Sequence, residues 1–368
     1  MTSSFGVGLV GIQPGRSWGH LAHVPAIAAL PDDFRLIGIA NTSAASAQAA
    51  VDVIGVGRAF SDVDALVADP EVDVVTVCVK VPHHLEIVRK AIAAGKNVYC
   101  EWPIGNGLAE AREMTALAQE KGVLAVAGTQ ARVSPGFLYL RDLIDSGFVG
   151  DVLSATLIGT GMSWGAVTEV PNAYTLDVRN GAHMLTIPFG HTLSAVTDVL
   201  GPIANVTSLV KTMRGQATVV ETGEVLPMTS PDQVLVAAEL QSGVPLSIHY
   251  RGGMPRGTGL LFEINGTAGD LQATAIGGHG QFLDLSIAGA SGDQPAMAPM
   301  PIPETYRSTL GLDPYAQNVG EMYHAMAADL RHGTRTVPSF ADAVRTHQLI
   351  AAIEQASGTG KRVALADV

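Results

Sequence analysis

A glycine-rich turn near the amino terminus has the residue types that bind phosphate. The apolar run 5–10 leads into Gly11-Ile-Gln-Pro-Gly15-Arg-Ser-Trp-Gly19, after which a helical pattern begins. Such a turn lets backbone N–H groups approach a pyrophosphate at the helix N-terminus. Gln13 stands where a second glycine is usual and the turn is lengthened, so an ordinary Gly/Pro turn is the alternative. The expected nucleotide contacts in this turn are Gly11, Gln13, Gly15, Arg16, Ser17 and Trp18.

The end of the second predicted strand bears on the choice of coenzyme. At about twenty residues beyond the glycine turn, a carboxylate normally binds the ribose 2′-hydroxyl of NAD. The chain instead has Asn41, Thr42 and Ser43 there, with no acidic residue. These side chains can donate hydrogen bonds, and Arg16 can pair with a phosphate. We therefore expect NADP, with NAD as the alternative, although the same run can also N-cap the next helix.

The first 130 residues alternate apolar runs with helical patterns. Strands are predicted at 5–10, 34–40, 72–79, 97–100 and 123–127, and helices near 17–30, 44–53, 62–68, 82–94 and 108–121. Strands this apolar are covered on both faces, which is typical of a parallel sheet in a doubly wound domain. The sequence therefore predicts a Rossmann domain over residues 1–130.

A different pattern follows in residues 131–368. Longer, alternating strands are predicted at 151–160, 233–240, 246–250 and 260–265, and two helices at 314–332 and 339–357. Alternation indicates a large, mostly antiparallel sheet with one open face. We expect an α+β domain for substrate binding and oligomerisation, whose C-terminal helix can pack back on the first domain. Because a bare open sheet would expose apolar surface, we expect a homodimer or homotetramer through this sheet.

Composition excludes several classes of protein. The formal charge of −12, without a Lys/Arg run, argues against nucleic acid as a partner. No apolar stretch approaches the roughly 18 residues of a membrane span. The first residues show no signal-peptide pattern. Cys78 and Cys100 fit reduced core residues better than a redox pair, so a cytoplasmic protein is expected. No metal is expected.

Several motifs together resemble one family. They include Val79-Lys-Val-Pro-His-His84, Glu101-Trp-Pro103, Thr129-Gln-Ala-Arg132 and Asn180-Gly-Ala-His-Met-Leu-Thr-Ile-Pro-Phe-Gly-His-Thr192. With the glycine turn they resemble the Gfo/Idh/MocA nicotinamide-dependent oxidoreductases, and within them the branch of the yeast galactose-regulon repressor. The resemblance implies cofactor contacts from Val79, Lys80, His84, Glu101, Trp102 and Gln130.

The chain departs from this family at two catalytic positions. The family usually has a lysine between the glutamate and the proline, and that lysine assists proton and hydride transfer to a sugar-like carbonyl. Trp102 stands there instead, and an indole has no titratable proton near neutral pH. The family also places an aspartate four residues before a histidine, whereas Ile187 precedes His191 here. Two of the three positions therefore lack an ionisable group.

The remaining candidates for proton transfer are two histidines and a tyrosine. The resemblance implies a helix that faces the nicotinamide, and on it His183 and His191, eight residues apart, would share a face. Histidine titrates near neutral pH, as proton transfer requires. Tyr174 is the third candidate. Each of them can equally be a packed structural residue, and Lys80 can either supply the missing charge or pair with a nearby anion.

Three functions remain open at this level. The first is an NADP-dependent oxidoreductase acting on a small, polar, sugar-like carbonyl or alcohol, or on an imine, which arrives already protonated and needs less acid catalysis. The second is a nucleotide-binding sensor without turnover, as the resemblance to the repressor allows. The third is sugar isomerisation or glycoside cleavage with bound nicotinamide. The first is favoured, because two histidines are retained.

Overall fold

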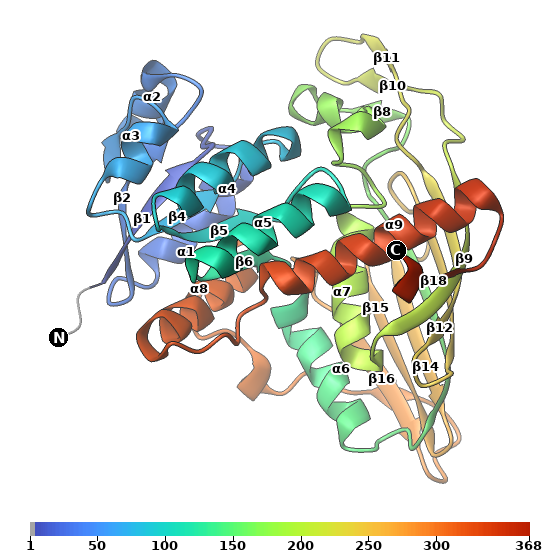
Figure 1. Ribbon diagram of the computed structural model, residues 1–368. Helices are drawn as coiled ribbons and strands as arrows, with labels where there is room; N and C mark the ends of the chain where they lie inside the picture. The colour runs from blue at the N-terminus through green and yellow to red at the C-terminus, as the bar shows by residue number, and fades with distance from the viewer. Residues whose placement is uncertain (1–3) are drawn as a thin grey trace. The chain divides into compact units, whose positions relative to one another are not determined.

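Residues 4–368 are described by the computed structural model (Figure 1). They form two units. The first unit comprises Met1–Gln130 and Ser308–Arg345, and the second comprises Ala131–Arg307 and Thr346–Val368. The change of unit after Gln130 coincides with the predicted one. The segment Ser308–Arg345 belongs with the first unit, whereas the sequence analysis placed it in the second.

A six-stranded parallel sheet forms the centre of the first unit. Its order is β3-β2-β1-β4-β5-β6, and every neighbouring pair is parallel. The strands are β1 (Phe5–Val10), β2 (Phe34–Ala40), β3 (Arg58–Ala59), β4 (Val74–Val77), β5 (Asn97–Glu101) and β6 (Ala125–Gly128). The strand order reverses between β1 and β4, and nucleotides bind at such a point in open α/β sheets. The predicted Rossmann architecture is confirmed.

Helices cover both faces of this sheet. They are η1 (Gly19–His23, a π-helix), α1 (Val24–Ala28), α2 (Ala44–Ile54), α3 (Val63–Ala68), η2 (Val81–His83), α4 (His84–Ala93), α5 (Leu108–Lys121) and α8 (Pro314–His332). Helix α8 packs on η1 and α1. It does so because its buried face, which includes Val319, Met322 and Tyr323, completes the core of the first unit. This packing explains why a C-terminal segment belongs to the first unit.

The second unit contains a nine-stranded sheet of order β17-β16-β15-β14-β7-β13-β12-β9-β18. Its strands are β7 (Val152–Thr160), β9 (Ile203–Lys211), β12 (Gln233–Leu240), β13 (Pro245–Arg251), β14 (Leu260–Gly266), β15 (Gly269–Ala275), β16 (Ser286–Ser291), β17 (Ala298–Pro299) and β18 (Val363–Ala364). Only the β7–β13 pair among them is parallel. The predicted mostly antiparallel sheet is therefore confirmed.

Helices and a small sheet complete the second unit. The helices are α6 (Pro135–Asp145), α7 (Pro188–Leu200) and most of α9 (Phe340–Thr359), with 3-10 turns η3 (Gln130–Val133), η4 (Val170–Leu176), η5 (Val178–Asn180), η6 (Glu304–Tyr306) and η7 (Leu365–Asp367). The small sheet has the order β11-β10-β8, formed by β8 (Val167–Thr168), β10 (Gln216–Val219) and β11 (Val225–Pro227).

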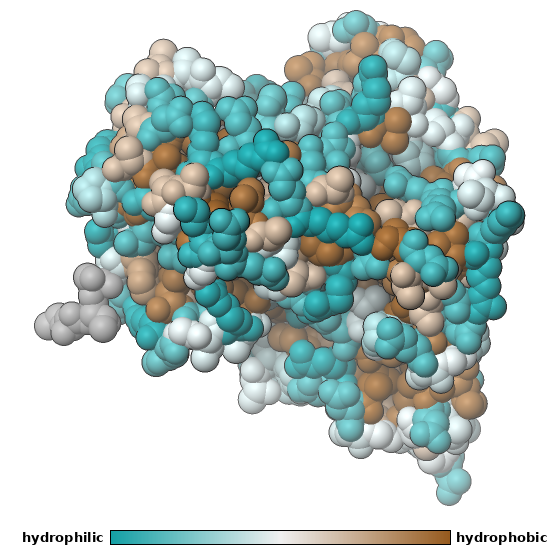
Figure 2. All heavy atoms as spheres, viewed as in Figure 1, coloured by the Kyte–Doolittle hydropathy of each residue, from teal (hydrophilic) through white to brown (hydrophobic). Residues whose placement is uncertain are grey.

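The large sheet buries alternate residues and leaves the others on its outer face. In β12, Val234 and Val236 are buried while Leu235 is exposed. In the space-filling view, hydrophobic residues are visible at the lower right, over the strands that Figure 1 labels β12, β14 and β16 (Figure 2). Among residues 4–368, no helix has both the length and the apolar character that crossing a membrane requires.

Candidate nucleotide-binding site and histidine cluster

The turn after β1 lies directly against the segment after β4. Gly11 has a left-handed backbone with φ of 97°. A Cβ atom at this position would lie 2.6 Å from Val79 Cγ1 and 2.9 Å from the carbonyl oxygen of Cys78. Only glycine fits both the conformation and the space. The two loops at the reversal of strand order are therefore in contact, as a nucleotide site at this point of the fold requires.

Ser17 closes the turn and starts the helix. Its Oγ accepts hydrogen bonds from the backbone N–H of Gln13, over 2.9 Å, and of His20, over 3.3 Å. Gly15 also has a left-handed backbone, with φ of 79°, but its Cβ position is open. Arg16 and Gln13 are exposed and Trp18 is half-buried. The lengthened turn is thus an ordered structure whose cationic side chain lies on the surface.

The three polar residues after β2 have different surroundings. Asn41 Oδ1 accepts from the backbone N–H of Ile12 over 2.8 Å, and Asn41 Nδ2 donates to the Ile12 carbonyl over 2.9 Å. Asn41 therefore holds the glycine turn in place. Ser43 Oγ caps α2 by accepting from the backbone N–H of Ser46 over 3.2 Å, so the helix-cap interpretation holds for Ser43. Thr42 is exposed.

His84 connects two loops at the carboxyl end of the parallel sheet. One ring nitrogen lies 2.9 Å from the Pro103 carbonyl oxygen and the other 3.0 Å from that of Val79. The ring is buried, and this burial lowers the pKa of His84 below its usual value. Lys80, four residues earlier, is exposed. His84 therefore positions Val79, which in turn contacts the glycine turn.

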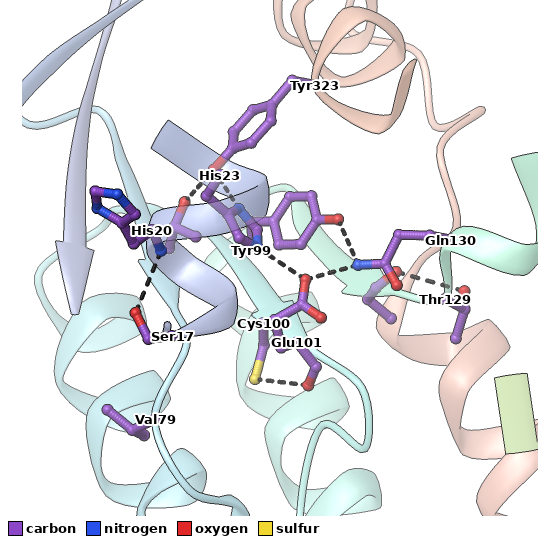
Figure 3. A network of polar contacts seen from close by, with 12 residues as sticks. Ser17, His20, His23, Val79, Tyr99, Cys100, Glu101, Thr129, Gln130 and Tyr323 are labelled. Atoms are coloured by element: carbon purple, nitrogen blue, oxygen red, sulfur yellow. Dashed lines mark hydrogen bonds and ion pairs between the residues drawn. The ribbon is translucent and has the colours of Figure 1, made fainter. Parts of the chain in front are cut away.

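Glu101 is the centre of a buried network in the first unit (Figure 3). Glu101 Oε1 accepts from His23 Nε2 over 2.9 Å and from Gln130 Nε2 over 2.7 Å. The side chain of Glu101 is 12 % exposed and that of His23 is fully buried. Trp102, the next residue, is 5 % exposed. The glutamate of the motif is thus retained as an anchored carboxylate, while the family's lysine position holds a buried indole.

These residues fit a nicotinamide dinucleotide on two structural observations. The close approach at Gly11 brings backbone to the place where the pyrophosphate binds in this fold. In addition, Gln130 Oε1 is buried without a hydrogen-bond donor among the described residues. A buried acceptor of this kind is costly unless a ligand supplies the donor. A ribose hydroxyl or a carboxamide N–H would satisfy it.

In the second unit, His183 and His191 do not share one helix. Helix α7 begins at Pro188, because a proline has no N–H and suits the first helical turn. His183 lies before it, in a turn where the backbone N–H of Ile187 donates to the His183 carbonyl over 2.7 Å. The expected shared helical face is therefore wrong, although both rings are buried.

Burial keeps both histidines neutral at pH 7. It lowers the pKa of His183 to about 4 and is the main cause that lowers the pKa of His191 to about 3. His183 Nδ1 has no hydrogen-bond partner among the described residues. Neutral imidazoles can accept a proton or donate a hydrogen bond, but they do not carry a charge at this pH. The near-neutral pKa expected of His183 as a proton-transfer residue is therefore wrong.

A third histidine of this unit was missed by the sequence analysis. His279 Nε2 donates to the Gly161 carbonyl over 2.7 Å and its Nδ1 accepts from Gln281 over 2.9 Å. Its proximity adds to the lowering of the pKa of His191, and burial lowers its own pKa to about 4. The glycines beside it, Gly278 and Gly280, signal close packing, but no spacing in the sequence links it to α7.

Thr192 connects this third histidine to α7. Its Oγ donates to the Gly278 carbonyl over 2.8 Å and accepts from the backbone N–H of Gly280 over 3.3 Å. The residues on both sides of His279 are thus bonded to the neighbour of His191. Two hydrogen bonds therefore hold the segment Gly278–Gly280 against α7.

The loop after β7 is strained. Met162 and Trp164 have left-handed backbones, with φ of 59° and 57°, which are unusual for bulky residues. Trp164 Nε1 donates to the Thr175 carbonyl over 3.2 Å, next to Tyr174 in η4. Burial raises the pKa of Tyr174, so its hydroxyl keeps its proton at neutral pH.

Within residues 4–368, no group of three or more His, Cys, Asp or Glu side chains is placed to hold a metal ion.

Comparison with known families matches two segments of the chain to family models. Residues 5–129 match the Gfo/Idh/MocA model, described as an oxidoreductase family with an NAD-binding Rossmann fold. Residues 135–275 match the Gal80p C-terminal domain. The solved structure of a super-repressor mutant of Gal80p from Saccharomyces cerevisiae superposes with a TM-score of 0.90 at 22 % identity, covering 98 % of both chains. A levoglucosan dehydrogenase in complex with NADH and levoglucosan has a TM-score of 0.84 at 21 % identity, covering 98 % of this chain and 99 % of that one. At these identities the structures show the fold.

Curated relatives include both regulators and dehydrogenases. The galactose/lactose metabolism regulatory protein GAL80 of Saccharomyces cerevisiae is 25 % identical over 76 % of this chain and 69 % of its own length. The Kluyveromyces lactis protein is 27 % identical over 76 % and 65 %. Dehydrogenase aclE of Aspergillus oryzae is 31 % identical over 55 % and 56 %. The chain thus joins a Rossmann domain of the Gfo/Idh/MocA oxidoreductase family to a second domain of the Gal80p C-terminal type.

Proposed function

We propose that this protein is an NADP-dependent oxidoreductase that transfers hydride between the nicotinamide and a small polar substrate. The observation that carries the proposal is the contact of the Gly11 turn with Val79 at the reversal of strand order, beside the anchored Glu101. When bound, the coenzyme supplies the hydride chemistry. The protein's own residues hold the nucleotide and handle the proton.

The surroundings of the histidines bear on the substrate. His183 and His191 are neutral at pH 7, so they suit a proton acceptor or a hydrogen-bond donor better than a strong acid. Alcohol oxidation needs an acceptor for the hydroxyl proton. Reduction of an imine needs little acid, because its nitrogen arrives protonated. A sugar-like alcohol or carbonyl and a cyclic imine are therefore the substrate classes that we propose.

The preference for NADP rests on the end of β2. No carboxylate stands there to repel a 2′-phosphate, and Asn41 is engaged with the glycine turn. The exposed Arg16 and Thr42 offer a cation and a hydroxyl for that phosphate. NADH-bound relatives of the same fold keep NAD as the alternative.

Purified protein tests the proposal directly. It should be mixed with NADPH and keto-sugars, aldehydes or cyclic imines, and with NADP and sugar alcohols, while absorbance of the reduced nicotinamide is followed. We expect turnover with one class, and a large loss in His183→Asn or His191→Asn. Tight binding of NADPH without turnover of any substrate would contradict the enzyme assignment.

A regulatory protein without turnover is the second candidate. It is favoured by the match of residues 135–275 to the Gal80p C-terminal domain and by Trp102 at the position of the catalytic lysine. Such a protein would respond to the nucleotide by changing its affinity for a protein partner. Sugar isomerisation or glycoside cleavage with bound nicotinamide is the third. In that case substrate would be consumed without net change in coenzyme absorbance.

Self-association through the large sheet belongs to the same proposal. A row of outer-face residues crosses the sheet in register: Leu209, Leu235, His249, Ile158 and Leu261. Leu209 and Leu235 are 47 % and 41 % exposed. A second copy of the chain could cover this mostly apolar row and remove it from water, which would give a homodimer or homotetramer. We also propose a cytoplasmic location, which the two free cysteines fit.

A further inference from the structure

The network around Glu101 draws on distant parts of the first unit. His23 comes from η1, Thr76 from β4, Tyr99 and Glu101 from β5, and Tyr323 from α8. Figure 3 shows His23 between the Tyr323 hydroxyl and the Glu101 carboxylate. His23 Nδ1 lies 3.0 Å from the Tyr323 oxygen, which lies 2.8 Å from Thr76 Oγ. All of these side chains are buried.

The hydrogens of this network follow from its donors and acceptors. An ionised carboxylate only accepts, so His23 Nε2 must carry a hydrogen toward Glu101. When His23 is neutral, Tyr323 donates to Nδ1 and Thr76 donates to Tyr323. When His23 is protonated, Nδ1 donates to Tyr323 and Tyr323 donates to Thr76. Two hydroxyls thus accommodate either state, and Glu101 keeps its donor in both.

The two oxygens of Glu101 are used differently. Oε1 accepts from both His23 and Gln130. No residue of the described range 4–368 donates a hydrogen bond to Oε2. The Glu101 side chain is slightly exposed. Gln130 Nε2 is shared between Glu101 and the Tyr99 hydroxyl, 3.2 Å away, while its Oε1 lacks a donor. The network therefore presents two acceptor oxygens, the Oε2 of Glu101 and the Oε1 of Gln130, which suit hydroxyl or amide hydrogens better than a phosphate.

We propose that His23 is a positioning residue that fixes the Glu101 carboxylate for the nicotinamide nucleoside, and that Tyr323 holds the opposite nitrogen of the His23 ring in place. This inference rests on the proposed function, in which Glu101 binds the coenzyme. The ligand groups recognised are hydrogen-bond donors, namely ribose hydroxyls or the carboxamide N–H. A residue of the C-terminal segment thereby serves a site otherwise built from the first 130 residues.

The position of His23 supports this role over packing alone. Tyr99 and Tyr323 already stack, with ring centroids 5.1 Å apart, and both rings meet His23 edge to face. An apolar ring would fill the same space, and it would have no ring nitrogens that need hydrogen-bond partners. His23 also ends a π-helix, a rare element frequent at functional sites, and that helix starts at the glycine turn. One helix thus links the turn to Glu101.

The test compares coenzyme affinity with stability. The dissociation constants of NADPH and NADH should be measured by calorimetry, at a temperature where denaturant curves show every variant folded. We expect His23→Ala to weaken binding about 10-fold or more, the loss of one hydrogen bond to a charged group. His23→Gln should stay within about three-fold of the native protein, because its amide can still donate to Glu101. Asp329→Asn is the matched control. It alters a buried carboxylate elsewhere on α8 that accepts from Thr334 and Thr336, so it should lower stability without changing affinity.

A double-mutant cycle separates positioning from general damage. In a Glu101→Gln background, His23→Ala should weaken binding less than two-fold, because its target carboxylate is gone. Equal affinities of the native protein and His23→Ala would overturn the inference. So would equal losses in His23→Ala and His23→Gln, or an undiminished loss in the Glu101→Gln background. A native protein that binds neither coenzyme would instead overturn the proposed function, and the inference with it.

Discussion

A side chain at Gly11 would collide with Val79, since its Cβ would lie 2.6 Å from Val79 Cγ1. The backbone there is also left-handed. We therefore expect Gly11→Ala to destabilise the protein by about 1–3 kcal/mol and to weaken coenzyme binding, as measured by denaturant unfolding and coenzyme titration. Gly15→Ala is the matched control, because Gly15 is left-handed but has nothing within 4 Å of its Cβ position. Equal losses in both variants would refute the steric explanation.

The exposed guanidinium of Arg16 should discriminate between the two coenzymes. Replacing it by alanine removes an ion pair with the 2′-phosphate of NADPH, which NADH lacks. We expect Arg16→Ala to weaken the binding of NADPH about 10-fold, equivalent to about 1.4 kcal/mol. The affinity for NADH should stay nearly unchanged. Titration of both coenzymes measures this. Tighter binding of NADH than NADPH by the native protein would show the NADP assignment to be wrong.

Three histidines of the second unit, the buried His183 and His191 and the half-buried His279, should make stability fall in mild acid. Their pKa values are lowered to about 4 for His183, about 3 for His191 and about 4 for His279, against roughly 6.5 in an unfolded chain. Between these pKa values the unfolded chain binds protons that the folded chain does not bind. The free energy of unfolding is therefore at its full value above pH 6.5 and declines below it. Each histidine contributes up to about 1.4 kcal/mol per pH unit in that window. Denaturant unfolding from pH 7.5 to pH 5 measures the slope, which should become shallower in His191→Asn. An unchanged slope in that variant would contradict the assignment.

Thr192 should matter more than its size suggests. Thr192→Val keeps the shape but removes the hydroxyl that donates to the Gly278 carbonyl and accepts from the Gly280 N–H. The Gly278 carbonyl still accepts from Tyr250, whereas the buried Gly280 N–H loses its acceptor. We expect a loss of about 1–3 kcal/mol in denaturant unfolding. Thr197→Val, on the same helix, removes a hydroxyl bonded to the nearby Ser194 carbonyl and should cost clearly less. Equal costs would argue against a special role for Thr192.

Charge on the outer row of the large sheet should abolish self-association. Leu235 pairs in register with Leu209 and with His249. We expect the native protein to have the mass of a dimer or tetramer in light scattering, and Leu235→Glu to have that of a monomer, because an interface excludes an unpaired charge. Thr207→Glu, on an exposed position of β9, tests how far the interface extends. A monomeric native protein would refute the proposal.

Much of the nucleotide half was predictable because its signals are local. Gly11, the apolar strands and the absence of an acid after β2 are properties of short segments, and the parallel sheet follows from them. The roles of Asn41 and Ser43 were only partly predictable. Their side chains can serve either a ligand or the backbone, and the choice depends on which backbone groups lie nearby.

The histidines show where pattern reasoning failed. The spacing of eight residues predicts one helical face for His183 and His191. However, α7 begins at Pro188, so His183 lies before the helix and only His191 lies on it. Their depressed pKa values also follow from burial, which spacing does not reveal. His279 lies almost ninety residues beyond His191 and reaches its surroundings only through the pairing of distant strands.

By itself the sequence determined the Rossmann architecture, the alternation of strands and helices in the first 130 residues, and the loss of ionisable groups at Trp102 and Ile187, because these depend on residue type and short spacing. Only the tertiary structure decided that Tyr323 joins His23 and Glu101, and that residues 308–345 belong with the first unit. The physical reason is that hydrogen-bond partners and burial are set by packing between segments far apart in the chain.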